Sequence, residues 1–206
     1  MEEQFFIKAG EVRLEARFIP GAVAAGVVIT HPHPLYGGSM NNNVVWTAVR
    51  AFGDRGWSTL RFNFRGVGKS TGVHGDGLAE VEDLAGAVTF FTSRVTGPCF
   101  VVGYSFGAAV AARALLTGLK AAGAVLIAPP IAFMDLAFLP QTPALSLIVA
   151  GDLDDLCPLA DLESLCRRLQ SPVHLRVVSG ADHFFSGREE ELYRILKEFP
   201  LPSDPA

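Results

Sequence analysis

The sequence contains few of the residues that mark several common protein classes. Only three of its 206 residues are cysteines, Cys99, Cys157 and Cys166, and their spacing fits no metal-binding motif. Three cysteines cannot all pair with one another, so we interpret them as free buried thiols in a reducing compartment. Lysine and arginine number 17 against 21 acidic residues, for a net charge of -4. A nucleic acid partner is not expected, because a surface that binds phosphates needs clustered basic residues.

Long hydrophobic runs are also missing, although half of the residues are hydrophobic and the mean hydropathy is +0.32. The most apolar runs, AAGVVIT from Ala24 and AGAVLIAPPIAF from Ala122, are interrupted by glycine or proline well short of the roughly 20 residues of a spanning helix. No membrane partner is therefore expected. The first residues, MEEQFFIKAGE, lack the basic and apolar segments of a secretory signal. We expect a cytoplasmic protein.

Short apolar runs alternate with stretches of helical periodicity along most of the chain. An antiparallel hairpin is predicted first, with strands at 4–8 and 12–18. Further strands are predicted at 24–30, 58–63, 99–104, 122–127, 144–150 and 173–178, and helices at 43–55, 79–93, 106–117, 159–169 and 188–198. This alternation predicts an α/β fold, in which a mostly parallel sheet of about eight strands carries helices on both faces.

Nothing in the sequence divides the chain into separate domains. It has no internal repeat and no linker rich in glycine, serine or proline, so we predict a single domain over 1–206, with a disordered tail at about 200–206. Residues 128–143 contain four prolines, which disfavour a helix there. A cap domain would have to lie in this short segment, so we expect a minimal cap.

The pentapeptide Gly103-Tyr104-Ser105-Phe106-Gly107 is the main chemical motif. It matches G-x-S-x-G, which places a serine on a turn so tight that its neighbours must be nearly free of side chains. The pentapeptide alone is weak evidence, because glycine is common here. A predicted strand before it and a predicted helix after it supply the required context. We therefore predict Ser105 as a nucleophile.

A serine nucleophile needs a histidine base and a carboxylate, which follow it in the order acid, then histidine, in this kind of fold. His183 lies in the loop after the last predicted strand, where a base is expected. The acid loop after the strand that ends at Ala150 carries three carboxylates, Asp152, Asp154 and Asp155. Their positions alone leave the acid open.

The tetrahedral intermediate of such a reaction needs backbone N–H donors for its oxyanion. One predicted donor is Phe106, directly after the nucleophile. The other is expected in residues 31–38, HPHPLYGG, where proline has no N–H, so His33 and Leu35 remain and we prefer Leu35. His31 and His33 lie two residues apart without a third ligand, so no metal site is expected. We interpret them as residues that brace this loop.

The stretch from Gly66 to Ser70, GVGKS, has some likeness to a phosphate-binding loop. The first glycine of that motif is missing, because Asn63 stands five residues before Gly68, and no helix start follows Lys69. A nucleotide site is not expected. We predict instead a loop beside the active site, with Arg65 making local hydrogen bonds.

Five segments together, HPHPLYGGSMNN, RFNFRGVGKSTG, GYSFGA, GDLDDLCP and GADHFF, resemble the small bacterial α/β-hydrolases without a developed cap, near the dienelactone-hydrolase-like group. The resemblance covers nearly the whole chain. It implies that the acid is the third residue after the glycine that ends its strand, which is Asp154. It also implies esterase activity on small acyl esters. Dienelactone hydrolases proper have a cysteine where this chain has Ser105, so their lactone substrate is not carried over.

These observations predict a carboxylesterase that forms an acyl-enzyme at Ser105, with His183 as base and Asp154 as the acid that orients it. No metal or organic cofactor is expected, and the expected partner is a small-molecule ester. We expect an open substrate pocket lined by Phe106 and by further aromatic residues, Tyr36, Phe133 and Phe138. Such a pocket suits short acyl groups.

Other functions remain open at this point. A thioesterase or a peptidase would use the same three residues, and a non-catalytic binding module would keep the same fold. The physiological ester and the oligomeric state, including a homodimer, are not determined by the sequence, because pocket shape and surface contacts decide them.

Overall fold

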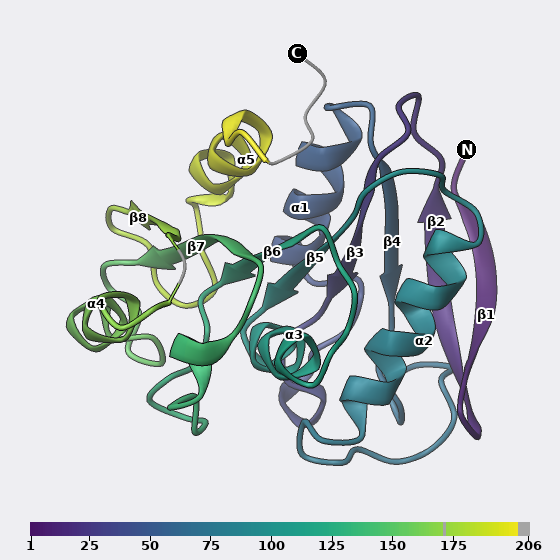
Figure 1. Ribbon diagram of the computed structural model, residues 1–206, viewed down its shortest axis with the longest axis horizontal. Coiled ribbons are helices and arrows are strands. Elements are labelled where there is room, and N and C mark those ends of the chain that lie inside the picture. Colours follow the sequence, from purple (N-terminus) through teal and green to yellow (C-terminus); the bar gives the residue numbers. More distant parts are fainter. Residues whose placement is uncertain (171, 202–206) are drawn as a thin grey trace.

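The structure is a computed structural model that describes residues 1–170 and 172–201. Within these residues, eight strands form one sheet in the order β1-β2-β4-β3-β5-β6-β7-β8. The strands are β1 (Glu3–Ala9), β2 (Val12–Ile19), β3 (Gly26–Thr30), β4 (Ser58–Phe62), β5 (Cys99–Tyr104), β6 (Gly123–Ile127), β7 (Leu145–Gly151) and β8 (His174–Val178). Figure 1 shows the twist of this sheet from β1 to β8.

The strand directions match the predicted fold class. β1 pairs with β2 and β2 pairs with β4 in antiparallel register, whereas every other neighbouring pair is parallel. Parallel neighbours require crossovers through the helices, which explains why helical and strand-like segments alternate in the sequence. The predicted mostly parallel sheet with an N-terminal antiparallel hairpin is confirmed.

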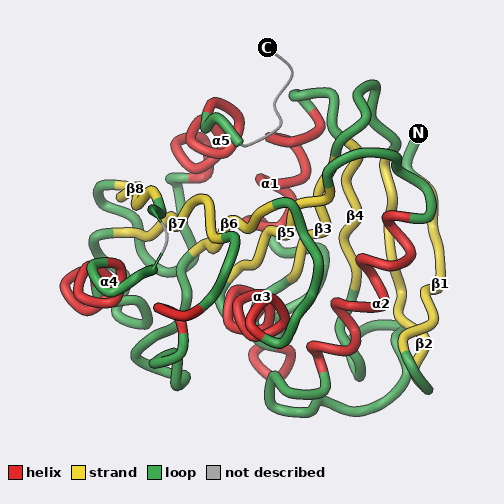
Figure 2. The backbone as a smooth tube through the Cα atoms, viewed as in Figure 1, coloured by secondary structure: helices red, strands yellow, loops and turns green. Residues whose placement is uncertain are grey.

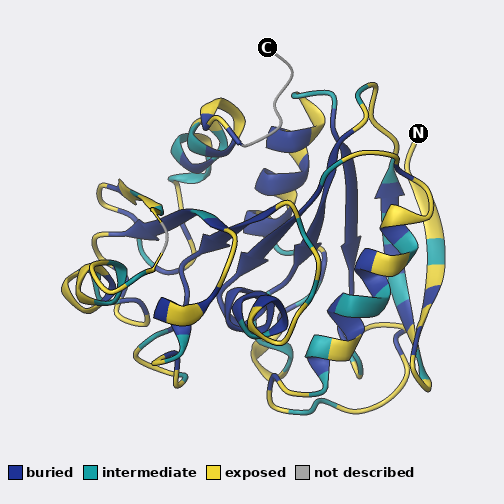
Figure 3. Ribbon diagram, in the orientation of Figure 1, coloured by how far each residue is buried: buried dark blue, intermediate teal, exposed yellow. Residues whose placement is uncertain are grey.

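In the part of the chain that the structure describes, five helices cover both faces of the sheet: α1 (Asn43–Gly53), α2 (Glu80–Thr92), α3 (Phe106–Leu116), α4 (Leu159–Cys166) and α5 (Glu189–Glu198). α1 and α5 pack together over one face, and α2 packs beside α3 over the other (Figure 2). Two hydrophobic clusters result, one on each side of the sheet. Figure 3 shows the central strands buried between these layers, while β1 is partly exposed.

The burial patterns follow from the position of each strand. β3, β4, β5 and β6 are buried at every residue, as expected for parallel strands covered on both faces. β2, near the sheet edge, instead buries alternate residues. The apolar runs of the sequence are therefore sheet core. Among the described residues, no helix combines the length and the apolar composition that crossing a bilayer requires.

The predicted C-terminal tail lies mostly outside the described residues. Residues 202–206 belong to the part that the structure does not describe, so the prediction of disorder stays untested there. Leu201 is described, and its side chain is buried against the cluster beneath α1 and α5. This apolar residue at the start of the predicted tail therefore packs on the core.

Candidate active site

Ser105 lies on the sharp turn between β5 and α3. Its backbone has φ 53° and ψ -119°, a positive φ that costs energy for any residue except glycine. The Ser105 N–H donates to the Ile127 carbonyl at the end of β6 at 2.9 Å, which holds the turn against the neighbouring strand. The strained backbone presents the Ser105 hydroxyl at the carboxyl end of the sheet.

The glycines of the motif are required by close backbone contacts. A Cβ at Gly103 would meet the Gly107 carbonyl oxygen at 2.5 Å, and one at Gly107 would collide with the Thr30 hydroxyl and, at 2.8 Å, with the His31 carbonyl oxygen. Real Cβ atoms do not approach other atoms so closely, so a side chain at either position would push α3 away from β3 and β5. The motif is therefore a packing requirement as well as a chemical one.

The structure brings the three predicted side chains into one hydrogen-bonded row. The Ser105 hydroxyl lies 2.8 Å from His183 Nε2, and His183 Nδ1 lies 2.8 Å from Asp154 Oδ2. All three residues are buried, with exposed fractions of 6%, 6% and 4% for Ser105, His183 and Asp154. They come from three loops that follow β5, β7 and β8, far apart in sequence but adjacent at one edge of the sheet.

Backbone amides hold Asp154 in place. The N–H groups of Leu156 and Cys157 each donate to Asp154 Oδ1 at 2.9 Å, and the His183 ring lies within 2.9 Å of the same oxygen. Asp152 points elsewhere, because its carboxylate accepts from the Gly180 N–H and the Ser179 hydroxyl. The geometry thus separates the carboxylates that the sequence alone left open, and Asp154 is the one beside the histidine.

Tyr104 fixes the loop that carries His183 by a hydrogen bond to its backbone. Its hydroxyl donates to the His183 carbonyl at 3.0 Å, and its ring centroid lies 5.8 Å from that of His183. Burial raises the pKa of the Tyr104 hydroxyl, and the charges of Asp154 and Asp182 raise it further. Tyr104 therefore stays a neutral donor that fixes the main chain at His183.

His31 is a buried brace rather than a ligand. Its Nδ1 lies 2.6 Å from the Pro32 carbonyl, and its Nε2 accepts the Phe64 N–H at 3.0 Å. This pattern requires the neutral ring with its proton on Nδ1. Burial lowers the pKa of His31 to about 4, in spite of the opposing carbonyl of Pro32. The bracing role predicted for this histidine matches these contacts.

The structure of the loop after β3 bears on the choice between Leu35 and His33 as the second oxyanion donor. The Leu35 N–H donates to His33 Nδ1 at 3.2 Å, and the Leu35 side chain is 71% exposed. Leu35 does not line the cavity over Ser105, whereas His33 and Phe106 do. Among the described residues, the N–H groups of His33 and Phe106 have no hydrogen-bond acceptor. The geometry therefore favours His33 over the preferred Leu35, because at the start of a one-turn 3-10 helix (Pro34–Tyr36) the Leu35 amide is bound to the His33 ring.

A cavity of about 380 Å³ opens above Ser105. Ser105 and His183 line this cavity, and Asp154 lies behind His183. We call these three hydrogen-bonded residues the floor, and the exposed aromatic residues Tyr36, Phe133 and Phe184 the mouth of the cavity. The lining consists of Pro32, His33, Tyr36, Gly37, Gly38, Asn42, Tyr104, Ser105, Phe106, Pro130, Phe133, Met134, Leu156, His183 and Phe184. Tyr36, Phe106 and Phe133 thus lie where the sequence placed them. No Lys, Arg, Asp or Glu is among these described lining residues.

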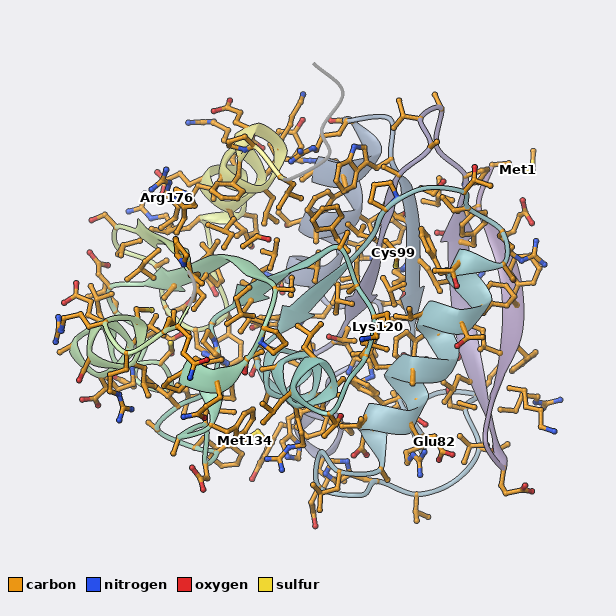
Figure 4. All side chains as sticks on the ribbon, in the orientation of Figure 1. Met1, Glu82, Cys99, Lys120, Met134 and Arg176 are labelled. Carbon is orange, nitrogen blue, oxygen red and sulfur yellow. The ribbon has the colours of Figure 1, made fainter. Side chains whose placement is uncertain are left out.

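Phe138 was predicted to line the pocket and does not. It packs against the hydrophobic cluster under α2 and α3, and the Arg113 guanidinium lies 4.9 Å from its ring centroid. The turns of the segment between β6 and β7 bring Phe133 and Met134 to the cavity and carry Phe138 past it toward α3. Figure 4 labels Met134, below α3 in that view. Spacing along a loop without periodic structure does not reveal which side chains face a cavity.

Several lining residues were missed. Phe184 follows His183 directly, and Leu156 lies two residues after Asp154, so both could have been found from their neighbours. Asn42 has no such signal: it caps α1, where its Oδ1 accepts the Val44 N–H at 2.9 Å, and the same residue lines the cavity. A residue at a helix start is ordinarily explained by capping alone.

Cys157 and Arg65 lie close to the functional loops and have structural contacts. Burial raises the pKa of the Cys157 thiol, which keeps it protonated behind Asp154. Within residues 1–170 and 172–201, no three His, Cys, Asp or Glu side chains gather as they would around a metal ion. Arg65 makes the local bonds expected of it, with its guanidinium 2.7 Å from Asp83 and 3.1 Å from Glu82.

Comparisons with known proteins agree with this architecture. The model of the family described as Serine aminopeptidase, S33, matches residues 27–146. An uncharacterized protein of Rickettsia prowazekii is 32% identical over 95% of this chain and 87% of its own length. An α/β serine hydrolase homologue from Coxiella burnetii is 38% identical, with a TM-score of 0.89 over 95% of this chain and 96% of its own. A serine hydrolase without a lid from Xanthomonas campestris is 29% identical, with a TM-score of 0.91 over 99% and 97%.

Proposed function

Because the chain belongs to the serine aminopeptidase family of α/β serine hydrolases, we propose that it hydrolyses small carboxylic esters through an acyl-enzyme at Ser105. The observation that carries this proposal is the continuous row of hydrogen bonds from the Ser105 hydroxyl through His183 to Asp154, with two links of 2.8 Å. These side chains provide a nucleophile, a proton acceptor and a carboxylate, so the proposed reaction calls for no metal or organic cofactor.

In the first step the Ser105 oxygen attacks the ester carbonyl carbon while its proton passes to His183 Nε2. Asp154 accepts the His183 Nδ1–H, which keeps the ring in the tautomer that leaves Nε2 free to take that proton. The tetrahedral intermediate collapses when the bond to the alcohol oxygen breaks and the alcohol leaves with the proton from Nε2. An acyl-Ser105 ester remains.

In the second step water replaces the alcohol. His183 Nε2 takes a proton from the water as its oxygen attacks the acyl carbon, and the bond to the Ser105 oxygen breaks. Ser105 recovers its proton from Nε2, and the carboxylic acid leaves. One ester and one water thus become one acid and one alcohol, and the enzyme returns to its starting state.

The oxyanion of both intermediates is assigned to the N–H groups of His33 and Phe106. Both residues line the cavity, and neither amide has an acceptor among the described residues. The Phe106 amide also begins α3, so the positive end of the helix dipole faces the developing charge. Unpaired donors directed at such a charge contribute on the order of 3 kcal/mol each to transition-state stabilisation.

The lining favours an ester over the substrate of an aminopeptidase. An aminopeptidase must hold a terminal ammonium next to the scissile bond, and a buried ammonium requires a carboxylate partner. The described lining contains no Asp or Glu, and Asp154 is occupied by His183 and two amides. The mostly aromatic and aliphatic walls of the cavity suit an uncharged acyl group instead. Because this cavity is small and lacks a cap, short acyl chains fit best.

The test combines covalent labelling with turnover. The protein is incubated with a fluorophosphonate probe and, separately, with p-nitrophenyl butyrate, and Ser105→Ala is compared with Ser93→Ala, which changes an exposed serine at the end of α2. We expect Ser105→Ala to abolish labelling and to lower kcat/KM by roughly 10³-fold or more. Ser93→Ala should behave like the wild type. Labelling and turnover that persist in Ser105→Ala refute the proposal, and turnover of no ester by the wild type favours a binding module.

A further inference from the structure

The loops that surround the cavity have an uneven distribution of charge. Every lining residue belongs to the nucleophile turn or to one of four loops, 31–42, 128–144, 152–158 and 179–188. The first three loops contain no Lys or Arg, although the whole chain has 17, and the fourth contains Arg188, which directly precedes α5 and lies 3.5 Å from Glu191. A ligand phosphate or carboxylate would find no cationic side chain among the described lining residues.

Acidic residues lie beside the lining in three of these loops. Asp135 follows Met134, Asp155 precedes Leu156, and both carboxylates are exposed. Asp182 lies two residues before Phe184, and its charge contributes to the raised pKa of the Tyr104 hydroxyl in the cavity wall. Each of these three loops therefore carries an acidic residue within two positions of a lining residue.

The segment between β4 and α2 and the first residue of α2 add two further acidic residues, Asp76 and Glu80. The charges of Asp76 and Glu80 act on the His33 ring, where they oppose the lowering of its pKa by burial and by His74. Arg65, which follows β4 by three residues, is already bound to Asp83 and Glu82. Lys69 is exposed, and its backbone N–H binds Glu15 on the outer part of the sheet.

We propose that this site, acting as the esterase proposed above, selects esters by the sign of their charge: it accepts uncharged esters, tolerates cationic ones and discriminates against anionic ones. An anionic acyl group entering the cavity would lose its hydration without gaining a counter-charge. It would also meet the field of the surrounding acids at the mouth. A cation at the end of an acyl chain reaches aromatic side chains, Tyr36, Phe133 and Phe184, whose ring faces attract it.

Selection by charge also limits which thioesters the site could hydrolyse if the protein were a thioesterase. Thioesters of nucleotide-bearing carriers have several phosphates close to the acyl group, and such carriers are held by lysine and arginine. The described lining residues include neither lysine nor arginine. A thioester substrate would therefore have to be a small uncharged one.

The experiment compares three p-nitrophenyl esters with four-carbon acyl chains that differ only at the far end: butyrate, hemisuccinate and 4-trimethylammoniobutyrate. The rate of hydrolysis in buffer alone is subtracted from each initial rate, because the hemisuccinate carboxylate also attacks its own ester carbonyl, and the resulting kcat/KM values are compared directly. We expect the anionic ester to be hydrolysed roughly tenfold less well than butyrate at low salt, and the cationic ester to lie between them. The gap between cationic and anionic esters should narrow in 1 M salt.

Charge-removal variants test whether the acidic loops cause the selection. The double variant Asp135→Asn with Asp155→Asn keeps an Oδ1 acceptor at position 135 for the Ala137 N–H. We expect it to raise the ratio of anionic to neutral ester hydrolysis about threefold. The control, Glu3→Gln with Glu198→Gln, removes two exposed charges at the start of β1 and at the end of α5, outside the cavity lining, and should leave the ratio unchanged. Figure 4 shows Met1, two residues before Glu3, on the opposite side of the molecule from Met134.

The outcomes separate this proposal from the function on which it rests. If the anionic ester is hydrolysed as well as the neutral one, or if both charged esters are equally poor substrates, selection by the sign of charge is refuted while the esterase stands. An equal change of the ratio in the two double variants refutes the role of the acidic loops. If no ester is turned over and the fluorophosphonate leaves Ser105 unlabelled, the esterase proposal itself fails.

Discussion

The floor and the mouth of the cavity are built in opposite ways. In the floor, Ser105, His183 and Asp154 are buried and hydrogen-bonded to one another, and backbone groups hold the Ser105 turn and the Asp154 carboxylate. In the mouth, the side chains of Tyr36, Phe133 and Phe184 are 74%, 50% and 57% exposed. Their rings contact other rings, as Tyr36 and Phe133 do at 5.8 Å between centroids.

This difference indicates that the floor determines the proposed reaction and stability, whereas the mouth determines which substrates the cavity accepts. A buried side chain with several fixed partners cannot be changed without leaving a polar group unpaired, so changes in the floor affect the proposed reaction and stability together. An exposed ring packs on little, so a change in the mouth affects mainly what the cavity accepts. Three predictions test this division, from the largest expected effect to the smallest.

The largest effect is expected at Asp154. Asp154→Asn keeps an oxygen for the Leu156 and Cys157 amides but presents an NH2 group to His183 Nδ1, which favours the wrong tautomer. We expect kcat/KM for p-nitrophenyl butyrate to fall roughly 10³-fold. Asp152→Asn, two residues away and bonded to Gly180 instead, should stay within about twofold of the wild type. A larger loss of kcat/KM in Asp152→Asn than in Asp154→Asn would show that Asp154 is not the acid that orients His183.

A smaller effect, on stability, is expected at His31 beneath the loop after β3. Its pKa of about 4 in the folded protein lies below the usual 6.5, because burial disfavours the charged ring. The unfolded chain therefore binds a proton first as pH falls. This contribution to stability is complete above about pH 6.5 and is lost progressively between pH 6.5 and 4, by about 3 kcal/mol.

Urea unfolding at a series of pH values measures this contribution. Other groups also titrate in the acid range, so the informative quantity is the difference between the wild type and His31→Gln. We expect the wild type to lose its advantage over His31→Gln as the pH falls from 6.5 to 4. Parallel profiles for the two proteins would show that His31 does not carry the effect.

The smallest effect is expected in the mouth. Phe133→Ala removes an exposed ring from the cavity wall, so it should raise KM for p-nitrophenyl butyrate about threefold to fivefold while changing the free energy of unfolding by less than about 0.5 kcal/mol. Phe138→Ala is the matched control, since that ring packs on the core and not on the cavity. It should lower stability by about 2 kcal/mol and leave KM unchanged. The reverse pattern would contradict the division between floor and mouth.

The prediction from sequence was most accurate where regular structure sets the position. The strands and helices were located to within two to three residues, because apolar runs bounded by glycine and helical periodicity both report directly on backbone conformation. The three loops that carry Ser105, Asp154 and His183 each follow a parallel strand. Parallel strands end at the same edge of the sheet, so residues far apart in sequence were expected to meet there.

The prediction was weakest inside the loops. The choice between His33 and Leu35 depended on one turn of 3-10 helix, whose hydrogen bond directs the Leu35 amide away from the cavity. Phe133 and Phe138 have the same chemistry, yet only the first lines the cavity. The direction of a loop side chain depends on contacts with distant segments, which spacing along the chain does not encode.

The sequence by itself determined the order of strands and helices, the tight turn at Ser105 and the loops in which a base and an acid must lie. These properties follow from local residue patterns and from the rule that parallel strands share an edge. Residue patterns within the chain left the acid open, and the tertiary structure showed that Asp154, the residue implied by the family resemblance, and not Asp152 meets His183. It also decided that the His33 amide has no acceptor among the described residues and that Phe133, but not Phe138, lines the cavity. The physical reason is that each of these depends on distances between segments brought together only by folding.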